Sequence, residues 1–248
     1  MKTFLMAACC LLIFSSLAQA GPPLLTSDTG TPDAGHWEIN AGFSLELSLS
    51  DSQAVIRALD INYGLGERIQ LKVELPWIFS NPDRDEAKNG VGNSVFGVKW
   101  RFLDEDRHGI AMSTYPQCEF NTARSSVDKG LVDKGTKFIL PFEIERKIGA
   151  VNITGEIGYI FNPENENQWF YGLAFGYKTS DRIEWVGEIF GVTSSNFDWA
   201  AHDLVFNLGF RWNLIKWLNL NTSVGRSLHP VAGNEKTLLL YSGLQFVF

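Results

Sequence analysis

The chain has 248 residues, of which 45% are hydrophobic and 13% aromatic, and its formal net charge is −7. This acidic balance argues against nucleic acid or another polyphosphate as a partner. Cys9 and Cys10 fall within an apparent export signal, which leaves Cys118 alone. No intramolecular disulfide is therefore expected in the exported chain, and other interactions must stabilise its fold.

The N-terminus has the features of a cleaved signal peptide over residues 1–20. Lys2 supplies the positive region, residues 4–17 the apolar core, and Ala18-Gln19-Ala20 the small-residue cleavage site. The polar, proline-containing stretch 21–35 follows and shows no periodicity. We expect this lead-in to be flexible in the periplasm.

Beyond the signal, no stretch approaches the roughly 18 apolar residues of a membrane-spanning helix. Apolar residues instead alternate with polar ones, which is typical of β-strands that have one buried or lipid-facing side. The expected strands are 36–47, 54–63, 69–77, 95–102, 109–120, 138–145, 151–161, 169–178, 183–192, 204–213, 218–226 and 238–248.

The last strand shows the pattern most clearly. Every second residue from Leu238 is apolar except Ser242, and the series ends with Phe246 and Phe248. A transmembrane β-strand needs about 9–11 residues with one face turned to lipid, and this segment fits that requirement. It also resembles the closing strand of bacterial outer-membrane barrels, which implies that Phe246 and Phe248 act as an assembly signal.

The connections between these strands indicate how they are arranged. Tight turns alternate with longer loops, the number of strands is even, and most Trp residues lie near strand ends, where aromatic girdles form. The alternative is a soluble β-sandwich, and such a fold gives no reason for Trp residues to lie near the strand ends. The sequence therefore predicts an all-β fold, a transmembrane up-and-down antiparallel barrel of about twelve strands, spanning 36–248 in the bacterial cell outer membrane.

One turn also allows a prediction of strand register. A symmetric turn centred near Gly66 would place Asp60 opposite Lys72 and Asn62 opposite Gln70. All four side chains belong to the polar face, so this pairing agrees with the alternation.

The polar face of the barrel should carry the charged side chains into the lumen. Those charges are Glu38, Glu46, Asp60, Lys72, Glu74, Lys99, Arg101, Glu143, Glu145, Glu156, Lys178, Glu184, Glu188 and Arg211. The candidates chosen as lumen-lining are Asp60, Lys72, Glu74, Lys99, Arg101, Glu184, Glu188 and Arg211. They either order a permeating solute or form cross-strand ion pairs that fill a narrow barrel.

Motifs for catalysis or cofactor binding are not evident. His202-Asp203 near Ser194 is the one composition that resembles part of a hydrolase site, and it lies at the edge of a loop. The sequence has neither a paired-His metal spacing nor a Gly-Lys-Ser/Thr phosphate loop. We therefore expect no catalytic residue, no metal site and no cofactor.

Three segments resemble a known bacterial family, the outer-membrane proteins named for the meta-pathway of phenol degradation, which are described as transporters. They are residues 35–40 (GHWEIN), 63–77 (YGLGERIQLKVELPW) and 97–103 (GVKWRFL). The resemblance is clearest over residues 35–106. It departs at Asn93, where the family has an Asp after Gly-x-Gly. The resemblance implies an outer-membrane location and passage of small organic molecules.

The leading functional hypothesis is a channel or transporter-like barrel that passes small organic solutes, aromatic or hydrophobic ones among them. A closed structural or adhesive barrel is the alternative, and a surface hydrolase on a barrel scaffold is a second one. The expected partners are outer-membrane lipid, the barrel-assembly machinery and a small organic solute, with no nucleic acid.

Overall fold

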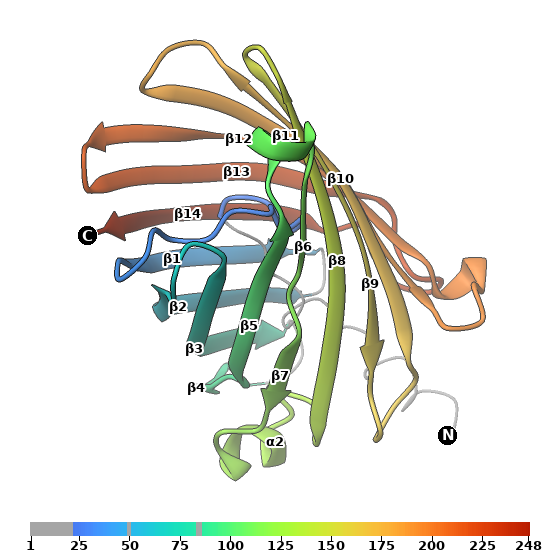
Figure 1. Cartoon of the computed structure of the whole chain (residues 1–248). Coiled ribbons are helices and arrows are strands. Elements are labelled where there is room, and N and C mark those ends of the chain that lie inside the picture. The colour runs from blue at the N-terminus through green and yellow to red at the C-terminus, as the bar shows by residue number, and fades with distance from the viewer. Residues whose placement is uncertain (1–21, 49–50, 83–85) are drawn as a thin grey trace.

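The computed structural model describes residues 22–48, 51–82 and 86–248, which form a closed antiparallel barrel (Figure 1). The signal peptide predicted for residues 1–20 lies outside the described residues. Twelve strands close the wall, which confirms the predicted fold class. Two of these wall strands are interrupted, so that the structure shows them as separate pieces.

Neighbouring strands in the chain are neighbours in the wall, as in an up-and-down barrel. The strands are β1 (Trp37–Leu47), β2 (Asp51–Gly64), β3 (Ile69–Pro82), β4 (Lys88–Val91), β5 (Ser94–Leu103), β6 (Ala111–Thr114), β7 (Gln117–Phe120), β8 (Thr136–Ile148), β9 (Val151–Phe161), β10 (Gln168–Lys178), β11 (Ile183–Ser194), β12 (Asp203–Ile215), β13 (Leu218–His229) and β14 (Leu238–Val247). Three short helices lie between strands: α1 (Glu105–His108), α2 (Arg124–Asp128) and η3 (Trp199–Ala201).

The interruptions have local causes. β4 and β5 pair with successive parts of β3 and together make one wall strand. β6 and β7 likewise pair with successive parts of β5 and β8. Pro116 separates β6 from β7, and it lacks the N–H that a continuous strand would donate at that position. The strand predicted at 109–120 is thus one strand with a break.

The barrel closes between β1 and β14. Trp37 N donates to Phe248 O at 2.6 Å, and Phe248 N donates to Trp37 O at 3.0 Å, beyond the ladder that joins the two strands. Both residues therefore lie at one end of the barrel, here called the termini end. The short turns lie at this end, and the longer connections, with α2 and η3, lie at the opposite loop end.

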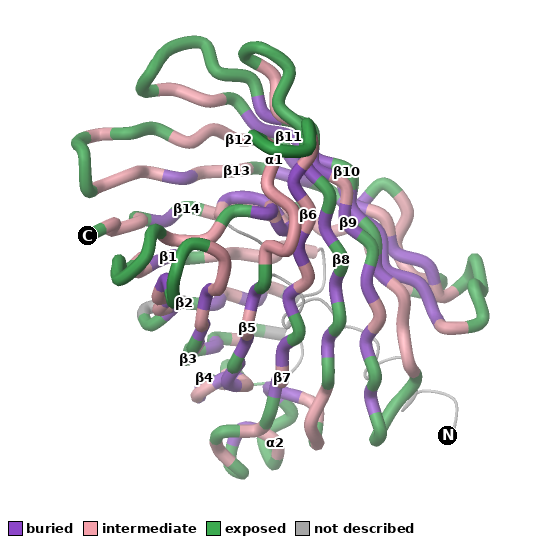
Figure 2. Tube along the Cα trace, in the orientation of Figure 1, coloured by how far each residue is buried: buried purple, intermediate pink, exposed green. Residues whose placement is uncertain are grey.

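Burial alternates along the wall strands, as the sequence pattern predicts (Figure 2). In β8, Leu140 is 58% exposed on the outer face, whereas Glu143 on the inner face is completely buried. The outer face is apolar, which suits contact with lipid. The inner face holds most of the polar side chains. Apolar and polar residues are thus separated between the two faces, as a membrane barrel requires.

Two details of the wall differ from the sequence prediction. The charged loop expected at 80–90 is shorter, because β3 continues to Pro82 and β4 begins at Lys88; residues 83–85 lie outside the described part. The register across the first turn is also different. Asp60 lies opposite Glu74 and Asn62 lies opposite Lys72.

The reason for the register difference is the length of the turn. Leu65 N donates to Ile69 O at 2.8 Å, and Gly66 has a φ of +72°, so the turn is centred one residue later than predicted. Moving the centre by one residue moves every cross-strand partner by two. Because side chains alternate with a period of two, the polar face is preserved.

Within the described residues, none of the helices is long and apolar enough to cross a membrane.

Candidate solute pathway in the lumen

The N-terminal segment, residues 22–35, lies inside the barrel. The prediction that it would be flexible in the periplasm is therefore wrong for this structure. Leu25 N and Thr26 N donate to the two carboxylate oxygens of Glu188, each at 2.7 Å, and Thr26 Oγ1 donates to Glu188 Oε2 at 2.6 Å. Ser27 N donates to the carboxylate of Glu156 at 3.0 Å. Polar wall residues thus satisfy the backbone of the segment, which has no sheet partner.

Two glycines let the segment lie directly on the wall. A Cβ added at Gly172 of β10 would overlap the side chain of Thr26, and a Cβ added at Gly64 would overlap the carbonyl oxygen of Asp33. Gly35 N also donates to Gly64 O at 2.8 Å. The absence of side chains at these two wall positions is what makes room for the segment.

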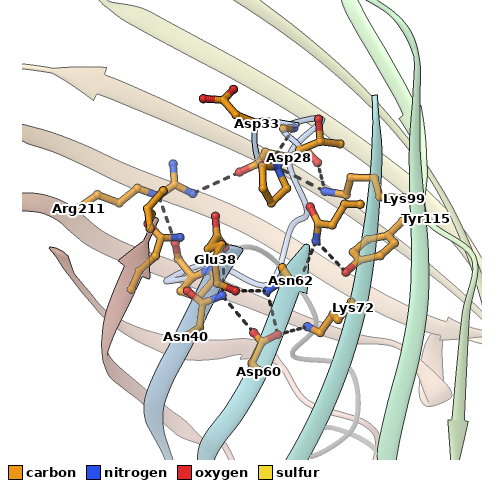
Figure 3. A pocket seen from close by; sticks show the side chains of 17 residues that line it. Asp28, Asp33, Glu38, Asn40, Asp60, Asn62, Lys72, Lys99, Tyr115 and Arg211 are labelled. Carbon is orange, nitrogen blue, oxygen red and sulfur yellow. Dashed lines mark hydrogen bonds and ion pairs between the residues drawn. The ribbon is translucent and has the colours of Figure 1, made fainter. Parts of the chain in front are cut away.

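Asp28 of the N-terminal segment links opposite walls of the barrel. Its carboxylate lies 3.9 Å from Lys99 Nζ of β5 and 3.8 Å from Arg211 Nη2 of β12 (Figure 3). Arg211 also contacts Glu184 Oε2 at 3.3 Å and donates to the carbonyl oxygen of Pro22 at 3.1 Å. Lys99 donates to the carbonyl oxygen of Asp28 as well. The segment is therefore fastened across the lumen by charge and by hydrogen bonds.

A polar cavity of about 390 Å³ remains between this segment and the wall near the termini end (Figure 3). Lys72 is buried at its edge, 3.4 Å from Asp60 and 2.9 Å from Glu74. Gln70 donates to Asn62 Oδ1 at 2.7 Å and to the hydroxyl of Tyr115 at 3.2 Å. The cavity is lined by Pro22, Asp28, Gly30, Thr31, Pro32, Asp33, Glu38, Asn40, Asp60, Asn62, Gln70, Lys72, Lys99, Tyr115, Arg211, Gln245 and Val247.

The eight lumen candidates fall into three places. Four line the cavity: Asp60, Lys72, Lys99 and Arg211. Glu74, Glu184 and Glu188 lie beside their partners Lys72, Arg211 and the N-terminal segment. Arg101 instead sits at the rim of the termini end, where its guanidinium contacts Asp104 and donates to the carbonyl oxygen of Glu67. The sequence analysis missed Asp28, Tyr115 and the amide side chains, because neither the lead-in nor uncharged groups were considered as lining.

On the side formed by β8 to β12, the loop half of the lumen carries apolar side chains, which the sequence analysis did not predict. A cluster of buried side chains faces inward from β8 to β12, here called the lumen apolar patch: Ile139, Ile160, Phe170, Phe190, Val192 and Val205. Leu25 of the N-terminal segment packs against this patch. A signal was present in runs such as Ile189-Phe190, in which adjacent residues are both apolar and so face both sides of the wall.

The connection that contains α2 folds over the loop end of the lumen. Leu131 and Val132 are buried against Val55 and Ile78. The base of this connection is held by side chains, since Asn121 Nδ2 donates to Asn93 Oδ1 at 2.8 Å. The interior is therefore narrowed from both ends of the barrel.

Asn93, where the sequence departs from the resembled family, takes part in that arrangement. Its Nδ2 donates to Glu119 Oε1 at 2.8 Å, and Lys137 Nζ lies 3.6 Å from the same carboxylate oxygen. An Asp at this position could not donate to Glu119 and would place two carboxylates together. The amide of Asn93 therefore makes a hydrogen bond to Glu119 that a carboxylate could not make.

His202 does not form a hydrolase site. Its Nε2 shares a hydrogen bond of 2.7 Å with the hydroxyl of Tyr171, and its ring stacks on Trp199 at 4.7 Å. Ser194 Oγ instead accepts from the backbone N–H of Asp198 at 3.2 Å. Burial and the neighbouring His229 lower the pKa of His202. Among the described residues, no group of three or more His, Cys, Asp or Glu side chains is arranged to hold a metal ion.

The barrel is similar to several solved outer-membrane proteins. The COG4313 outer membrane channel from Pseudomonas putida F1 aligns with a TM-score of 0.69 and 14% identity over 93% of this chain and 100% of that one. The NanC porin aligns with a TM-score of 0.62 and 8% identity over 84% and 98%, and the KdgM porin with 0.55 and 10% over 85% and 99%. These identities are low enough that the likeness concerns the fold.

No protein-family model matches the chain, and no curated protein matches its sequence. The phenol-degradation family therefore stays a resemblance. The structural matches and the closed wall together show that the chain is a bacterial outer-membrane β-barrel with the fold of channels and porins.

Proposed function

We propose that this protein is an outer-membrane channel or transporter-like barrel that passes small organic solutes, aromatic or hydrophobic ones among them. The observation that carries the proposal is the unfilled cavity of about 390 Å³ beside the N-terminal segment. A barrel with a purely structural role gains stability when its interior is packed, because voids forfeit contacts. This lumen instead keeps open space next to charged side chains.

Two regions of the lumen support this class of solute. The lumen apolar patch, with Phe170 and Phe190 at its centre, can pack against the apolar part of an organic molecule. The cavity near the termini end can bind its polar part. An inorganic ion has no apolar surface that could pack against this patch.

A closed structural barrel is the second candidate, and one observation favours it. The N-terminal segment and the α2 connection both occupy the interior and bury apolar side chains there. In this alternative, the segment is a permanent part of the core.

Ion current through single proteins in planar lipid bilayers separates the two candidates. We expect small stepwise currents from the wild-type protein, which phenol or benzyl alcohol should interrupt by occupying the lumen. Phe190→Ala should weaken that block, whereas Phe175→Ala should not change it, because Phe175 is 47% exposed on the outer face. A membrane that shows no current above its protein-free baseline at either polarity would favour the closed barrel.

A further inference from the structure

The wall carboxylates that hold the N-terminal segment lie in a row on three of four consecutive strands, since β10 between β9 and β11 contributes none. Glu145 lies on β8, Glu156 on β9 and Glu188 on β11, and the first of these accepts from Thr29 N at 3.3 Å. Glu188 accepts from the segment and also from Asn207 Nδ2 at 2.6 Å. An ionised carboxylate is only an acceptor, so this row can bind only groups that donate hydrogen bonds.

Positive charge reaches only part of this row. Residues 22–27 of the segment have no charged side chain, so the segment offers neutral donors only. Lys147 Nζ lies 3.6 Å from Glu145 and Lys99 acts electrostatically on Glu156, whereas Glu188 has no cationic partner among the described residues. A backbone N–H gives an ionised carboxylate a charge-assisted hydrogen bond but leaves its negative charge uncompensated, whereas an ammonium group adds direct charge attraction. A cationic donor would therefore bind here better than the segment does.

A second observation points to a ligand at the same place. Glu143 faces Glu156 directly across the β8–β9 ladder, and its side chain is completely buried. Glu143 Oε2 accepts from Ser113 Oγ at 2.5 Å, whereas Oε1 has no hydrogen-bond partner among the described residues. Two acids placed directly opposite each other on one face are unfavourable, and Lys99 is the one cation that acts on both of them among the described residues.

An apolar surface adjoins this row. A cavity of about 20 Å³ is lined by Leu25, Ser27, Gln117, Ile139, Glu156, Phe170 and Phe190. Glu156 therefore shares one space with the aromatic rings of the lumen apolar patch, and Leu25 of the segment fills the rest of that space. The segment itself is bound in this way: its N–H groups donate to the carboxylates, and its Leu25 side chain packs on the apolar patch.

We propose that Glu145, Glu156 and Glu188 form a binding site for the ammonium group of a small organic cation, whose aromatic or aliphatic part lies against Phe170 and Phe190. The cation and residues 25–29 of the segment compete for the same oxygens, so binding displaces this part of the segment. This inference rests on the proposed function, because the solute must enter the lumen.

The test uses three probes of nearly equal size: benzylammonium, benzyl alcohol and benzoate. Binding to the purified full barrel is measured by calorimetry at neutral pH, so it does not require that the barrel conduct. We expect benzylammonium to bind at least about tenfold more tightly than benzyl alcohol, which corresponds to one charged hydrogen bond, and benzoate to bind least. Equal binding of the three probes would overturn the proposal.

Substitutions locate the site. Glu156→Gln and Glu188→Gln should each weaken benzylammonium binding and leave benzyl alcohol binding nearly unchanged, whereas Glu166→Gln in an exposed loop should change neither. Thr26→Val removes the hydroxyl that donates to Glu188, so it should strengthen benzylammonium binding by weakening its competitor. Benzylammonium binding that none of the lumen substitutions alters would place the amine elsewhere and refute the site. A lack of ion current with normal benzylammonium binding would refute the channel but not this site.

Discussion

Thr26 Oγ1 donates a hydrogen bond to Glu188 Oε2 at 2.6 Å, although 162 positions separate the two residues in the sequence. This contact joins the N-terminal segment to the wall of the barrel at the middle of β11. Next to this contact Leu25 packs on the lumen apolar patch, so the segment touches both polar and apolar parts of the lumen lining. The segment is therefore part of the lumen lining, and substitutions that move it should alter what the barrel passes.

Lys72 allows a test of how tightly the polar wall is packed. The ammonium group is buried between Asp60 and Glu74, so Lys72→Glu would place three carboxylates together without a cation. We expect this change to lower the free energy of unfolding by about 3–5 kcal/mol, the usual cost of breaking a buried ion pair. Thermal unfolding followed by circular dichroism measures it. Arg124→Glu, in the exposed ion pair with Asp128, is a control for charge reversal and should leave the unfolding temperature nearly unchanged. An unchanged unfolding temperature for Lys72→Glu would show that water fills this part of the wall.

The C-terminal residue tests the predicted assembly signal. Phe248 is 58% exposed on the outside of the barrel, although its backbone is paired with Trp37. A charged group facing lipid costs up to about 2–4 kcal/mol at mid-depth and less near the membrane surface or for acids. We expect Phe248→Asp to reduce outer-membrane levels by more than this cost explains, because recognition by the assembly machinery is lost as well. Leu65→Asp, an equally exposed site in a turn, should have little effect. Equal membrane levels for Phe248→Asp and the wild type would contradict the assembly role.

Much of this fold could be predicted from the sequence, because the alternation of apolar and polar residues is imposed by lipid on one side of every strand. The polar wall positions Asp60 and Lys72 followed from that alternation, and the two side chains do form an ion pair at 3.4 Å. The residues directly opposite them were predicted wrongly, because the register depends on one residue in the turn at Gly66. The N-terminal segment was missed for a physical reason. It has no periodicity, and the wall supplies its hydrogen-bond partners from residues more than a hundred positions away.

The lumen apolar patch shows a second limit of the pattern. Phe190 and Ile189 are adjacent and both apolar, so one faces lipid and the other faces the lumen. A continuous apolar run does not distinguish a barrel wall with two apolar sides from a strand in a soluble core. The closed wall of the structure settles the choice, because each side chain of a strand then faces either the lipid or the lumen.

Orientation in the membrane is a prediction that labelling can test. We expect the termini end to face the periplasm, because the short turns lie there. In a Cys118→Ser background, a membrane-impermeant thiol reagent added to whole cells should label Lys129→Cys, next to α2, but not Asp181→Cys in a turn at the termini end. Asp83 and Arg84, predicted to be accessible too, lie outside the described residues. Labelling of Asp181→Cys in cells with an intact outer membrane would reverse the orientation.

His202 should make the loop end sensitive to pH. Burial, and then the proximity of His229, lower the pKa of His202, so the folded protein favours the neutral ring that bonds to Tyr171. A group whose pKa is lowered by folding stabilises the fold above its unfolded pKa of about 6.5, and this contribution is lost as the pH falls below that value. Asp203 and His229 are the other polar side chains next to it.

Hydrogen exchange of residues 195–202 measures the effect. We expect faster exchange near pH 5 than near pH 7.5 after correction for the intrinsic rates, because charging His202 places a cation in a partly buried site beside His229. His202→Phe keeps the stacked ring and removes the titration, so its exchange should show no such difference. A difference that persists in His202→Phe would assign the pH sensitivity to another group.

The central claim is that the lumen is a solute pathway partly occupied by the N-terminal segment, and the current through Gly172→Ala tests it most directly. The added methyl group would overlap Thr26, so the segment must move away from the wall. We expect wild-type protein in planar bilayers to conduct weakly and Gly172→Ala to conduct more. Gly155→Ala should match the wild type, because its methyl group meets only Ile144 Cγ2 at 3.3 Å. Silent membranes for both the wild type and Gly172→Ala, with the variant correctly folded, would contradict the account and leave a closed barrel.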